Sequence, residues 1–297
     1  MVSPGILLVD KPAGLTSHDV VARTRRALGT RKVGHAGTLD PMATGLLVIG
    51  VEGATRLLTY IVGADKTYEA TIRIGQTTGT DDADGEILTR APEQAWRAVT
   101  PERIAAGVAA LTGEISQVPS SVSAIKVDGR RAYDRVRAGE EVVLAARDVT
   151  VSRFEIVAER SGEGFLDLDV VVDCSSGTYI RSLARDLGAD LGVGGHLTAL
   201  RRTRVGDFDV ADAVMIEDIV ETALLTPAAA AVRVLDPLPV SAADARDLRH
   251  GKRLTDQASR LSGVLAAAID EDGVLVGVVE RRGVDLKSAM NMPEVAR

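Results

Sequence analysis

Residues 34–47 read GHAGTLDPMATGLL and hold one carboxylate, Asp40, among residues that restrict or release the backbone. Gly37 can adopt a positive φ, Pro41 fixes its own φ and lacks an amide donor, and Gly45 lets the chain turn into an apolar run. The pattern predicts a stiff loop that presents one carboxylate beside a buried strand. Two interpretations stand at this point: an ordinary turn capped by Asp40, and a loop that carries a catalytic carboxylate.

The bulk composition is typical of a globular chain. A length of 297 residues predicts roughly two domains, and an apolar fraction of 45% is ample for a packed core. The N-terminus has no basic stretch before its short apolar run, and no later segment approaches the ~18 uninterrupted apolar residues of a membrane span. We therefore expect a cytoplasmic protein with no membrane partner.

Cysteine and histidine usage gives no template for a metal site or an intramolecular disulfide. The chain has one cysteine, Cys174, and its 4 histidines are scattered without paired spacing. We expect Cys174 to be a small buried side chain, because its sequence context does not mark a reactive thiol. Since the sequence also lacks the glycine patterns of Rossmann folds and P-loops, we expect neither a metal nor an organic cofactor.

The charge of the chain sets a condition on nucleic-acid binding. The formal net charge is −7, whereas affinity for nucleic acid rests mainly on Lys and Arg contacts to phosphates. A single basic run is also typical of a solvated helix face or turn, so binding would need a discontinuous groove formed by several runs. The candidate runs are Arg23, Arg25, Arg26, Arg31 and Lys32; Lys126, Arg130, Arg131, Arg135 and Arg137; and Arg201, Arg202 and Arg204.

Hydrophobic periodicity predicts an α+β fold. In residues 66–74 the side chains alternate, and Tyr68 falls on the core-facing side of the expected strand. Strands and helices alternate along the chain without a regular βαβ period, which favours a mixed or antiparallel sheet. The expected strands are 5–10, 66–74, 147–158, 165–173 and an extended 196–206; the expected helices are 17–28, 101–113 and the segment that follows Cys174.

Three segments complete the organisation. Residues 77–85 carry Asp81, Asp82 and Asp84 but lack the spacing and closing glutamate of a calcium loop, so we expect a solvated turn. The Ala- and Leu-rich residues 216–234 predict a helical connector. From Asp236 the chain reads as a short helix and turn and then two strands, which predicts a compact β-rich module at the C-terminus.

Six stretches of the sequence resemble the bacterial TruB family of pseudouridine synthases. They are LLVDKPAGLTSHDVV, GHAGTLDPMATGLLVIGVEGATRL, KTYEATIRIGQTTGTDDADGE, PSSVSAIKVDGRRAYDRVRAGEEV, CSSGTYIRSLARDLG and LTALRRTRVG. Their order and spacing from the N-terminus to about residue 210 make the resemblance specific. Related synthases that act on ribosomal RNA carry Arg-Leu-Asp where this chain has Thr38-Leu39-Asp40, and relatives that work with guide RNA differ around SAIKVDGRRAYD.

The resemblance implies a fold, a substrate and a reaction. It implies a pseudouridine-synthase catalytic domain over residues 1–235, built around a mixed, largely antiparallel sheet, and a small PUA-like RNA-binding domain over residues 236–297. It also implies conversion of the T-loop uridine of tRNA, numbered 55 in the RNA, to pseudouridine. The implied partner is the T arm of tRNA, without a guide RNA or a protein partner.

The implied chemistry centres on Asp40. Uridine isomerisation breaks the N-glycosidic bond, rotates the uracil and joins C5 to C1′, and a carboxylate can hold one fragment covalently. Attack on the ribose, attack on the uracil ring and removal of a ribose proton all remain open. The resemblance places Arg181 beside Asp40, where a guanidinium would keep the carboxylate ionised; from the residues alone, a helix-surface ion pair explains Arg181 equally well.

The resemblance also implies a pocket for a uridine that has left the RNA stack. Tyr68 would stack on the flipped uracil and take part in proton transfer at C5, Tyr179 and Leu200 would line the pocket, and His35 would help hold the everted base. Without the resemblance, both tyrosines are as easily core residues and His35 a structural one. Lys11 and Pro12 would have a structural role or a role in RNA approach.

Two other classes of function compete with a synthase. In a noncatalytic RNA-binding protein or RNA chaperone, the loop around Asp40 would be only a structural turn. In a hydrolase, Asp40 would form an ester intermediate, but the chain has no evident water-activating His-Asp or paired-carboxylate motif. The joint presence of Asp40, Tyr68 and Arg181 favours the synthase.

Overall fold

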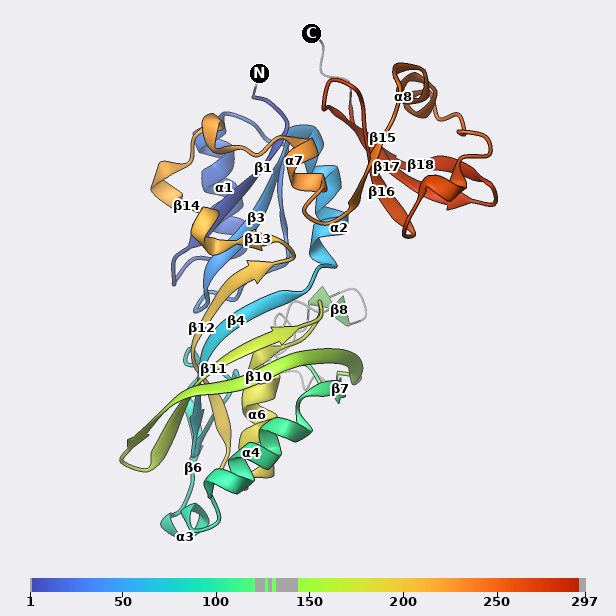
Figure 1. Ribbon diagram of the computed structural model, residues 1–297. Coiled ribbons are helices and arrows are strands. Elements are labelled where there is room, and N and C mark those ends of the chain that lie inside the picture. Colours follow the sequence, from blue (N-terminus) through green and yellow to red (C-terminus); the bar gives the residue numbers. More distant parts are fainter. Residues whose placement is uncertain (1, 121–125, 128–129, 132–143, 294–297) are drawn as a thin grey trace. The chain divides into compact units, whose positions relative to one another are not determined.

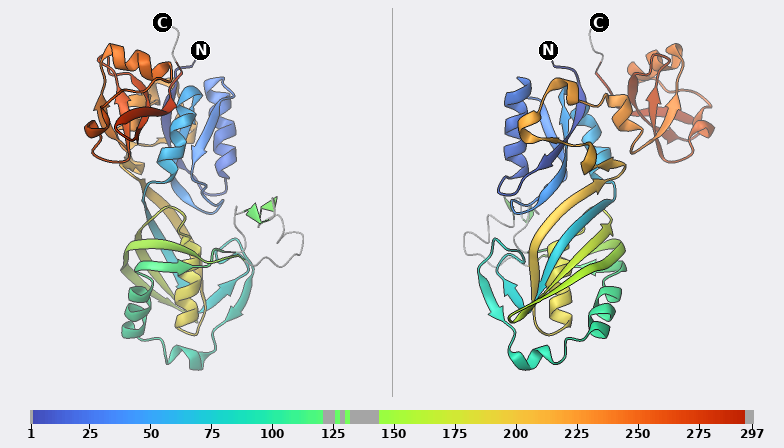
Figure 2. Two further views of the ribbon diagram at one scale, coloured as in Figure 1. Left: turned by 90° about the vertical axis from the view of Figure 1, so that its right-hand side faces the viewer. Right: turned by 60° about the vertical axis from the view of Figure 1, so that its left-hand side comes forward.

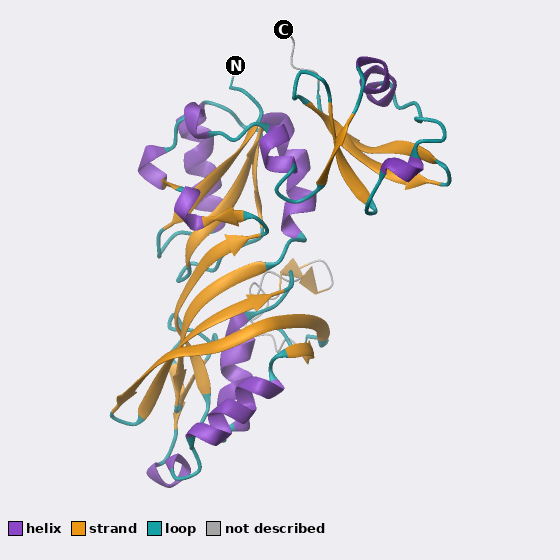
Figure 3. Cartoon of the chain, viewed as in Figure 1, coloured by secondary structure: helices purple, strands orange, loops and turns teal. Residues whose placement is uncertain are grey.

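The structure is a computed structural model and describes residues 2–120, 126–127, 130–131 and 144–293. The chain divides into two compact units: the first comprises residues 1–41, 45–64 and 204–297, and the second comprises residues 42–44 and 65–203. Figure 1 labels the elements, and Figure 3 shows that helices and strands occur in both units. The predicted α+β class is confirmed.

Two buried strands form the centre of the sheet in the first unit. β1 (Gly5–Lys11) and β3 (Thr44–Val51) pair antiparallel from Gly5 opposite Val51 to Lys11 opposite Gly45. β2 (Val33–Ala36) pairs antiparallel with β3, and β14 (Val214–Met215) pairs parallel with β1. The parallel strand makes the sheet mixed, as predicted.

Helix α1 (Ser17–Leu28) begins and ends where the sequence predicts. Its N-terminus is closed by a capping box, in which Thr16 accepts from the Asp19 amide while the Asp19 carboxylate accepts from the Thr16 amide. Gly29 ends the helix with a φ of 64°. The inward face carries Val20, Val21 and Thr24, which are buried, and the outward face carries Arg23, Arg25 and Arg26, which are exposed.

The expectation of a helical connector over residues 216–234 is wrong for most of that segment. The chain there forms two single 3-10 turns, η3 (Ile216–Asp218) and η4 (Glu221–Ala223), and only one short helix, α7 (Pro227–Ala231). β-branched residues are frequent before Pro227, and a proline is accepted in the first turn of a helix but not within one. The α-helix is therefore confined to the alanines that follow the proline.

The C-terminal module of the first unit is a small sheet in the order β15-β16-β17-β18. Its strands are β15 (Asp236–Pro239), β16 (Leu265–Ile269), β17 (Leu275–Arg282) and β18 (Asp285–Asn291), and it also carries α8 (Ala242–Arg249). The predicted β-rich module is confirmed. β18 was not expected from the sequence, because its DLKSAMN segment buries one leucine fully and shows no clear alternation.

The C-terminal module has its own core but also shares a core with the N-terminal strands. One cluster of buried residues lies wholly within residues 238–286. A second cluster joins Ala267, Leu275 and Val278 of the module to residues that include Leu57 and Ile61. The Arg56 guanidinium also donates to the Asn291 carbonyl at 2.5 Å. Removal of the module would therefore open part of the core of the first unit.

The second unit is built on a sheet in the order β12-β4-β11-β10-β7 (Figure 2). The strands are β4 (Lys66–Ile74), β7 (Gly113–Gln117), β10 (Arg147–Gly162), β11 (Phe165–Cys174) and β12 (Gly195–Val205). β11 pairs antiparallel with β4 and β10, and β10 pairs antiparallel with β7. The predicted alternation in β4 is confirmed, because Tyr68, Ala70, Ile72 and Ile74 are buried.

Two helices cover one face of this sheet. α4 (Pro101–Ala110) and α6 (Ile180–Asp190) pack against each other where Gly107 approaches the Leu187 side chain. α6 also contacts β4 of the sheet. Among the described residues no helix is both long and apolar enough to cross a membrane.

The remaining elements are short. In the first unit they are η1 (Glu52–Leu57), α2 (Leu58–Val62), β13 (Phe208–Asp209), η2 (Val210–Asp212) and η5 (Ala258–Arg260). In the second unit they are β5 (Gln76–Thr78), β6 (Ile87–Arg90), α3 (Glu93–Trp96), β8 (Lys126–Val127) and β9 (Arg130–Arg131).

Candidate functional site

The loop that carries Asp40 has no regular secondary structure. Residues 37–43 form neither helix nor strand, and their backbone turns at Gly37, with a φ of 84°, and at Gly45, with a φ of 98°. These values lie in the region that favours glycine, which explains both glycines in the motif. Since no strand ladder fixes this loop, its shape depends on contacts from neighbouring segments.

One serine holds the residue that precedes Asp40. The Leu39 amide donates to the Ser17 hydroxyl oxygen at 2.9 Å, and that hydroxyl donates to the Leu39 carbonyl at 3.2 Å. Ser17 is 1% exposed and Leu39 is 3% exposed. Both backbone polar groups of Leu39 are thus satisfied by one side chain on the capped first turn of α1.

A buried lysine holds the residue that follows Asp40. The Pro41 carbonyl accepts from the Gly14 amide at 2.8 Å and from Lys11 Nζ at 3.4 Å, and Lys11 Nζ also donates to the carbonyls of Pro12 and Leu15. Lys11 is fully buried. The structural role expected for Lys11 is confirmed, because the ammonium is turned inward onto carbonyl oxygens.

His35 lies in β2, in the same unit as Asp40. It pairs with Ile49 of β3 in the sheet, and its ring meets the ring of His18 edge to face, with the centroids 5.5 Å apart. His18 is exposed on the first turn of α1. The imidazole of His35 is therefore held between the strand and the helix that also supplies Ser17.

The other predicted site residues belong to the second unit. Tyr68 in β4 and Leu200 in β12 are each 7% exposed, on neighbouring strands of the same sheet. Tyr179 is the N-cap residue of α6 and is partly exposed, and Arg181 follows within the first turn. The site residues thus fall into two sets, with His35 and Asp40 in the first unit and Tyr68, Tyr179, Arg181 and Leu200 in the second.

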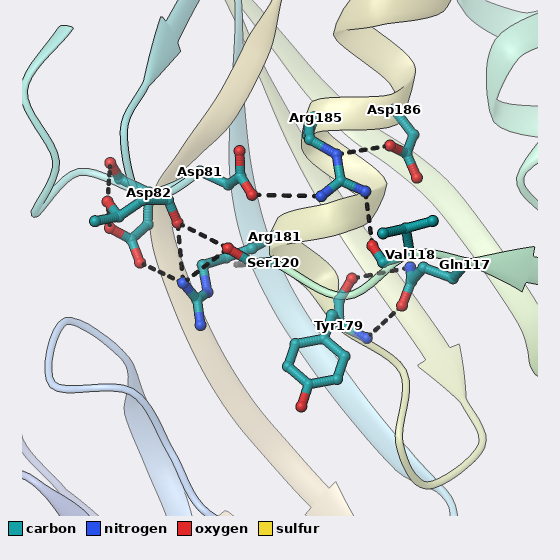
Figure 4. Close-up of polar contacts among 10 residues, drawn as sticks. Asp81, Asp82, Gln117, Val118, Ser120, Tyr179, Arg181, Arg185 and Asp186 are labelled. Atoms are coloured by element: carbon teal, nitrogen blue, oxygen red, sulfur yellow. Dashed lines mark hydrogen bonds and ion pairs between the residues drawn. The ribbon is translucent and has the colours of Figure 1, made fainter. Parts of the chain in front are cut away.

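Arg181 is not a surface residue of α6. Its side chain is 4% exposed, and one terminal nitrogen donates to the Thr80 carbonyl at 2.9 Å and lies 3.4 Å from a carboxylate oxygen of Asp82 (Figure 4). The same nitrogen contacts the Ser120 hydroxyl at 3.4 Å. The interpretation of Arg181 as a helix-surface ion pair is therefore wrong, because both charged partners are buried.

The expectation that residues 77–85 form a solvated turn is also wrong. Asp82 is 4% exposed, and its carboxylate accepts from the Thr80 hydroxyl and from the Asp84 amide. Asp81 faces Arg185 of α6 at 3.5 Å. The segment binds α6 through its acids, because the two arginines in the first turns of that helix supply cations to pair with them.

Asp82 was missed as a functional candidate, although a signal for it existed. Arg181 lies in the segment after Cys174 that was expected to be helical, and an arginine that is buried there requires an acidic or carbonyl partner. An acid-rich segment inside one of the family-like stretches was the natural source of that partner. Its exact pairing depends on tertiary structure, since Asp82 and Arg181 are far apart in sequence.

A cavity of about 570 Å³ lies in the second unit beside β4, β10, β11 and β12. Among the predicted site residues of the described chain, only Leu200 lines it. Its acids include Asp169, which accepts from Thr71 at 2.7 Å and pairs with Arg160. Apart from Leu200, the predicted site residues of the described chain therefore do not line this cavity.

The basic runs differ in how far they are available to a phosphate. Arg23, Arg25, Arg26, Arg31 and Lys32 are exposed in the first unit. Arg202, by contrast, is 1% exposed, so its inclusion in a surface run is wrong. The middle run lies outside the part of the chain whose side chains the structure describes.

Two buried titratable groups lie opposite each other in the second unit. Lys66 of β4 pairs with Cys174 of β11 in the sheet register. Burial, with a smaller contribution from Arg202, lowers the pKa of Lys66 to about 8, and burial raises the pKa of the Cys174 thiol to about 11. The prediction that Cys174 is a buried side chain is confirmed, and its raised pKa disfavours a thiolate.

Profiles of known protein families match most of the chain. The profile described as "TruB family pseudouridylate synthase (N terminal domain)" matches residues 25–180. Those described as "tRNA pseudouridylate synthase B C-terminal domain" and "tRNA Pseudouridine synthase II, C terminal" match residues 181–239 and 235–293. These matches, with the α+β fold, define an isomerase of the pseudouridine synthase class. Within that class, the chain belongs to the TruB family.

Similar proteins and similar structures extend over nearly the whole chain. A tRNA pseudouridine synthase B of Leifsonia xyli subsp. xyli is 60% identical over 99% of this chain and 98% of its own length. One of Nocardia farcinica is 57% identical over 94% of this chain and 90% of its own length. The fold resembles that of an archaeal box H/ACA Nop10-Cbf5 complex, with a TM-score of 0.70, 25% identity and coverage of 99% of this chain and 90% of the other.

Proposed function

We propose that this protein isomerises the T-loop uridine of tRNA, numbered 55 in the RNA, to pseudouridine. The observation that carries the proposal is the 60% identity, over 99% of the chain, to a relative named tRNA pseudouridine synthase B. The family membership supports the reaction class, and the relatives' names support tRNA as the substrate. The choice of uridine within the tRNA rests on the resemblance of the loop around Asp40 to the signature of this family.

Asp40 is the proposed nucleophile. The contacts of Ser17 with Leu39 and of Lys11 with Pro41 hold the backbone on both sides of Asp40, so the carboxylate is carried by a fixed loop. The reaction breaks the N1–C1′ bond, forms a C5–C1′ bond, removes the proton at C5 and adds one at N1. Attack on C1′, attack on the uracil ring and a glycal route each satisfy this balance with one carboxylate.

Arg181 is proposed to keep the Asp40 carboxylate ionised and oriented during the reaction. A guanidinium suits this role because it stays charged at every working pH and presents several donors in a plane. The buried contacts with Asp82 and with the Thr80 carbonyl support the proposal, since they fix the guanidinium before substrate binds. The pairing of Arg181 with Asp82 also reduces the free-energy cost of burying the positive charge of Arg181.

The flipped uridine is proposed to bind against the second unit. Removal of a base from the RNA stack costs a few kcal/mol, which stacking and polar contacts in the site must offset. Tyr68 is proposed to stack on the uracil and to take part in proton transfer at C5, with Tyr179 and Leu200 lining the pocket. His35 is proposed to help hold the everted base.

The RNA contacts are proposed to come from separate patches, because the chain has a formal net charge of −7. The exposed arginines of α1 are one such patch. The domain division into a catalytic domain over residues 1–235 and a PUA-like RNA-binding domain over residues 236–297 remains a proposal. We propose that the protein needs no guide RNA and no protein partner.

The test is an assay of a tRNA transcript radiolabelled at its uridines, digested after incubation and analysed for pseudouridine. We expect one pseudouridine per transcript at the T-loop position, and none in a matched transcript with cytidine there. A product at another position would contradict the assignment of the target uridine. Binding without pseudouridine would favour an RNA-binding protein, and release of free uracil would favour a hydrolase.

A further inference from the structure

Gln117 is a buried side chain that contacts the backbone of a proposed site residue. It is the last residue of β7 and is 1% exposed. Its amide oxygen accepts from the Tyr179 amide at 2.8 Å, and its amide nitrogen donates to the Tyr179 carbonyl at 3.1 Å (Figure 4). One side chain thus satisfies both backbone polar groups of Tyr179.

This contact lies at the start of α6, where helix ends need partners. The N-cap residue Tyr179 has no side-chain hydrogen bond to the helix, although serine, threonine, aspartate or asparagine usually supplies one. The Tyr179 carbonyl already accepts from the amides of Ser182 and Leu183. Gln117 adds a third donor to that carbonyl and engages the Tyr179 amide, so the first turn of α6 is held from outside.

Two of the three residues that follow Gln117 also contact α6. The Val118 carbonyl accepts from Arg185 at 2.7 Å, and the Ser120 hydroxyl contacts Arg181 at 3.4 Å (Figure 4). These two contacts reach the ends of long, adjustable arginine side chains. The contact from Gln117 reaches the backbone, so it fixes the position from which the Tyr179 ring extends.

We propose that Gln117 is a positioning residue for the isomerisation and acts through Tyr179. The proposal rests on the proposed function, in which Tyr179 lines the uridine pocket. Gln117 holds the Tyr179 backbone at two points, so the ring keeps one place and direction when the base enters. Gln117 itself does not touch the substrate.

Gln117→Met is the direct test, because methionine is close to glutamine in size and removes both hydrogen bonds. We expect the single-turnover rate at saturating tRNA to fall by about tenfold to a hundredfold, the scale of a small misplacement in an active site. The Kd for tRNA should change by less than about threefold, since phosphate contacts dominate affinity. Gln117→Glu, which keeps the acceptor but loses the donor, should show a smaller loss of rate.

A substitution in the core beside α6 distinguishes a loss of positioning from a general loss of stability. Ile104→Val removes one buried methyl group from α4, which packs on α6, and leaves the Gln117 contacts in place. Ile104→Val should lower the free energy of unfolding by an amount comparable to that of Gln117→Met and leave the single-turnover rate within about threefold of wild type. If Ile104→Val slows the reaction as much as Gln117→Met, the effect belongs to general stability and the proposal is wrong.

A double-mutant cycle with Tyr179→Ala tests whether Gln117 acts through Tyr179. Once the ring is absent, Gln117→Met should slow the reaction by less than about threefold, because there is no ring left to position. Equal effects in the two backgrounds would overturn the proposal, and so would failure of both Gln117 variants to fold. Absence of pseudouridine with the wild-type protein would instead overturn the proposed function.

Discussion

Asp82→Asn tests whether the buried partner of Arg181 supports both the fold and the reaction. Asparagine has the shape of aspartate and can still accept from the Asp84 amide, which the aspartate does at 3.1 Å. What the substitution removes is the negative charge that faces Arg181. The variant therefore isolates the electrostatic part of the contact.

The magnitude follows from the geometry of the pair. Arg181 is 3% exposed, Asp82 is 4% exposed, and their nearest nitrogen and oxygen are 3.4 Å apart. At an effective dielectric constant of about 20, two unit charges at that distance attract by about 5 kcal/mol, or 332/(20 × 3.4). Removal of one partner from a buried pair typically costs about 3–5 kcal/mol. The Thr80 carbonyl remains as an acceptor at 2.9 Å, so we expect the lower end, about 3 kcal/mol.

Two measurements follow from this estimate. Urea unfolding at neutral pH should show a free energy of unfolding lower by about 3 kcal/mol, and the slope with urea should be unchanged. Under conditions where the variant is fully folded, the single-turnover rate on tRNA should fall by at least about a hundredfold, because in the proposed mechanism a guanidinium displaced by about 1 Å no longer orients the proposed nucleophile. The Kd for tRNA should stay near the wild-type value.

The neighbouring Asp81 supplies the matched control. Its carboxylate pairs with Arg185 at 3.5 Å, but the two side chains are 18% and 29% exposed, and a partly solvated pair of this kind is worth about 0–1 kcal/mol. Asp81→Asn should therefore change stability by less than about 1 kcal/mol and the rate by less than about threefold. If the two variants behave alike in stability and rate, the role assigned to the Asp82–Arg181 pair is refuted.

Three further predictions concern the rest of the chain. Ser17→Ala should reduce the single-turnover rate by about tenfold or more, because both backbone groups of Leu39 lose their partner. The control Thr24→Val removes a buried hydroxyl from the same helix without touching the loop, and it should not reduce the rate. Equal rates for the two variants would contradict the role of Ser17. The pKa of Lys66 is about 8 in the folded protein, which is below its value of about 10.4 in the unfolded chain. Between about pH 8 and about pH 10.4, Lys66 is therefore protonated more often in the unfolded state than in the folded state. Stability accordingly rises with pH in this window. Urea titrations should therefore show that the free energy of unfolding of the wild-type protein, minus that of Lys66→Met, increases by about 3 kcal/mol between pH 7 and pH 10.5. A difference that does not change with pH would refute this. Deletion from residue 236 should lower the urea midpoint of the remaining chain, since the deletion opens the shared core, and an unchanged midpoint would show that the module is independent.

The elements with strong local periodicity were predictable from the sequence. α1 combines a capping box, an apolar stripe and a terminal glycine, and β4 alternates without interruption. Local backbone preference and burial agree in these segments, so the sequence pattern is sufficient. The segment 216–234 shows the reverse, because its alanine content favoured a helix while its β-branched residues and proline divided it into turns.

The residues of the candidate site were predicted mainly through resemblance to a family. Spacing alone left Asp40 and Arg181 open to a structural interpretation. The burial of Lys11 and the pairing of Asp82 with Arg181 could not be read from the sequence, because each depends on carbonyls or charges brought close by folding. The same holds for Gln117, whose partner Tyr179 is separated from it by 62 residues.

The most direct test of the account is the single-turnover rate of Asp40→Asn on tRNA, measured beside its tRNA affinity. The contacts that fix the loop are made by the backbone of Leu39 and Pro41, so the substitution should leave the fold and the Kd unchanged. Pseudouridine formation should fall below about a thousandth of the wild-type rate, because a carboxamide is not a nucleophile. A folded variant that binds tRNA normally and retains more than that activity would show that Asp40 is not the nucleophile.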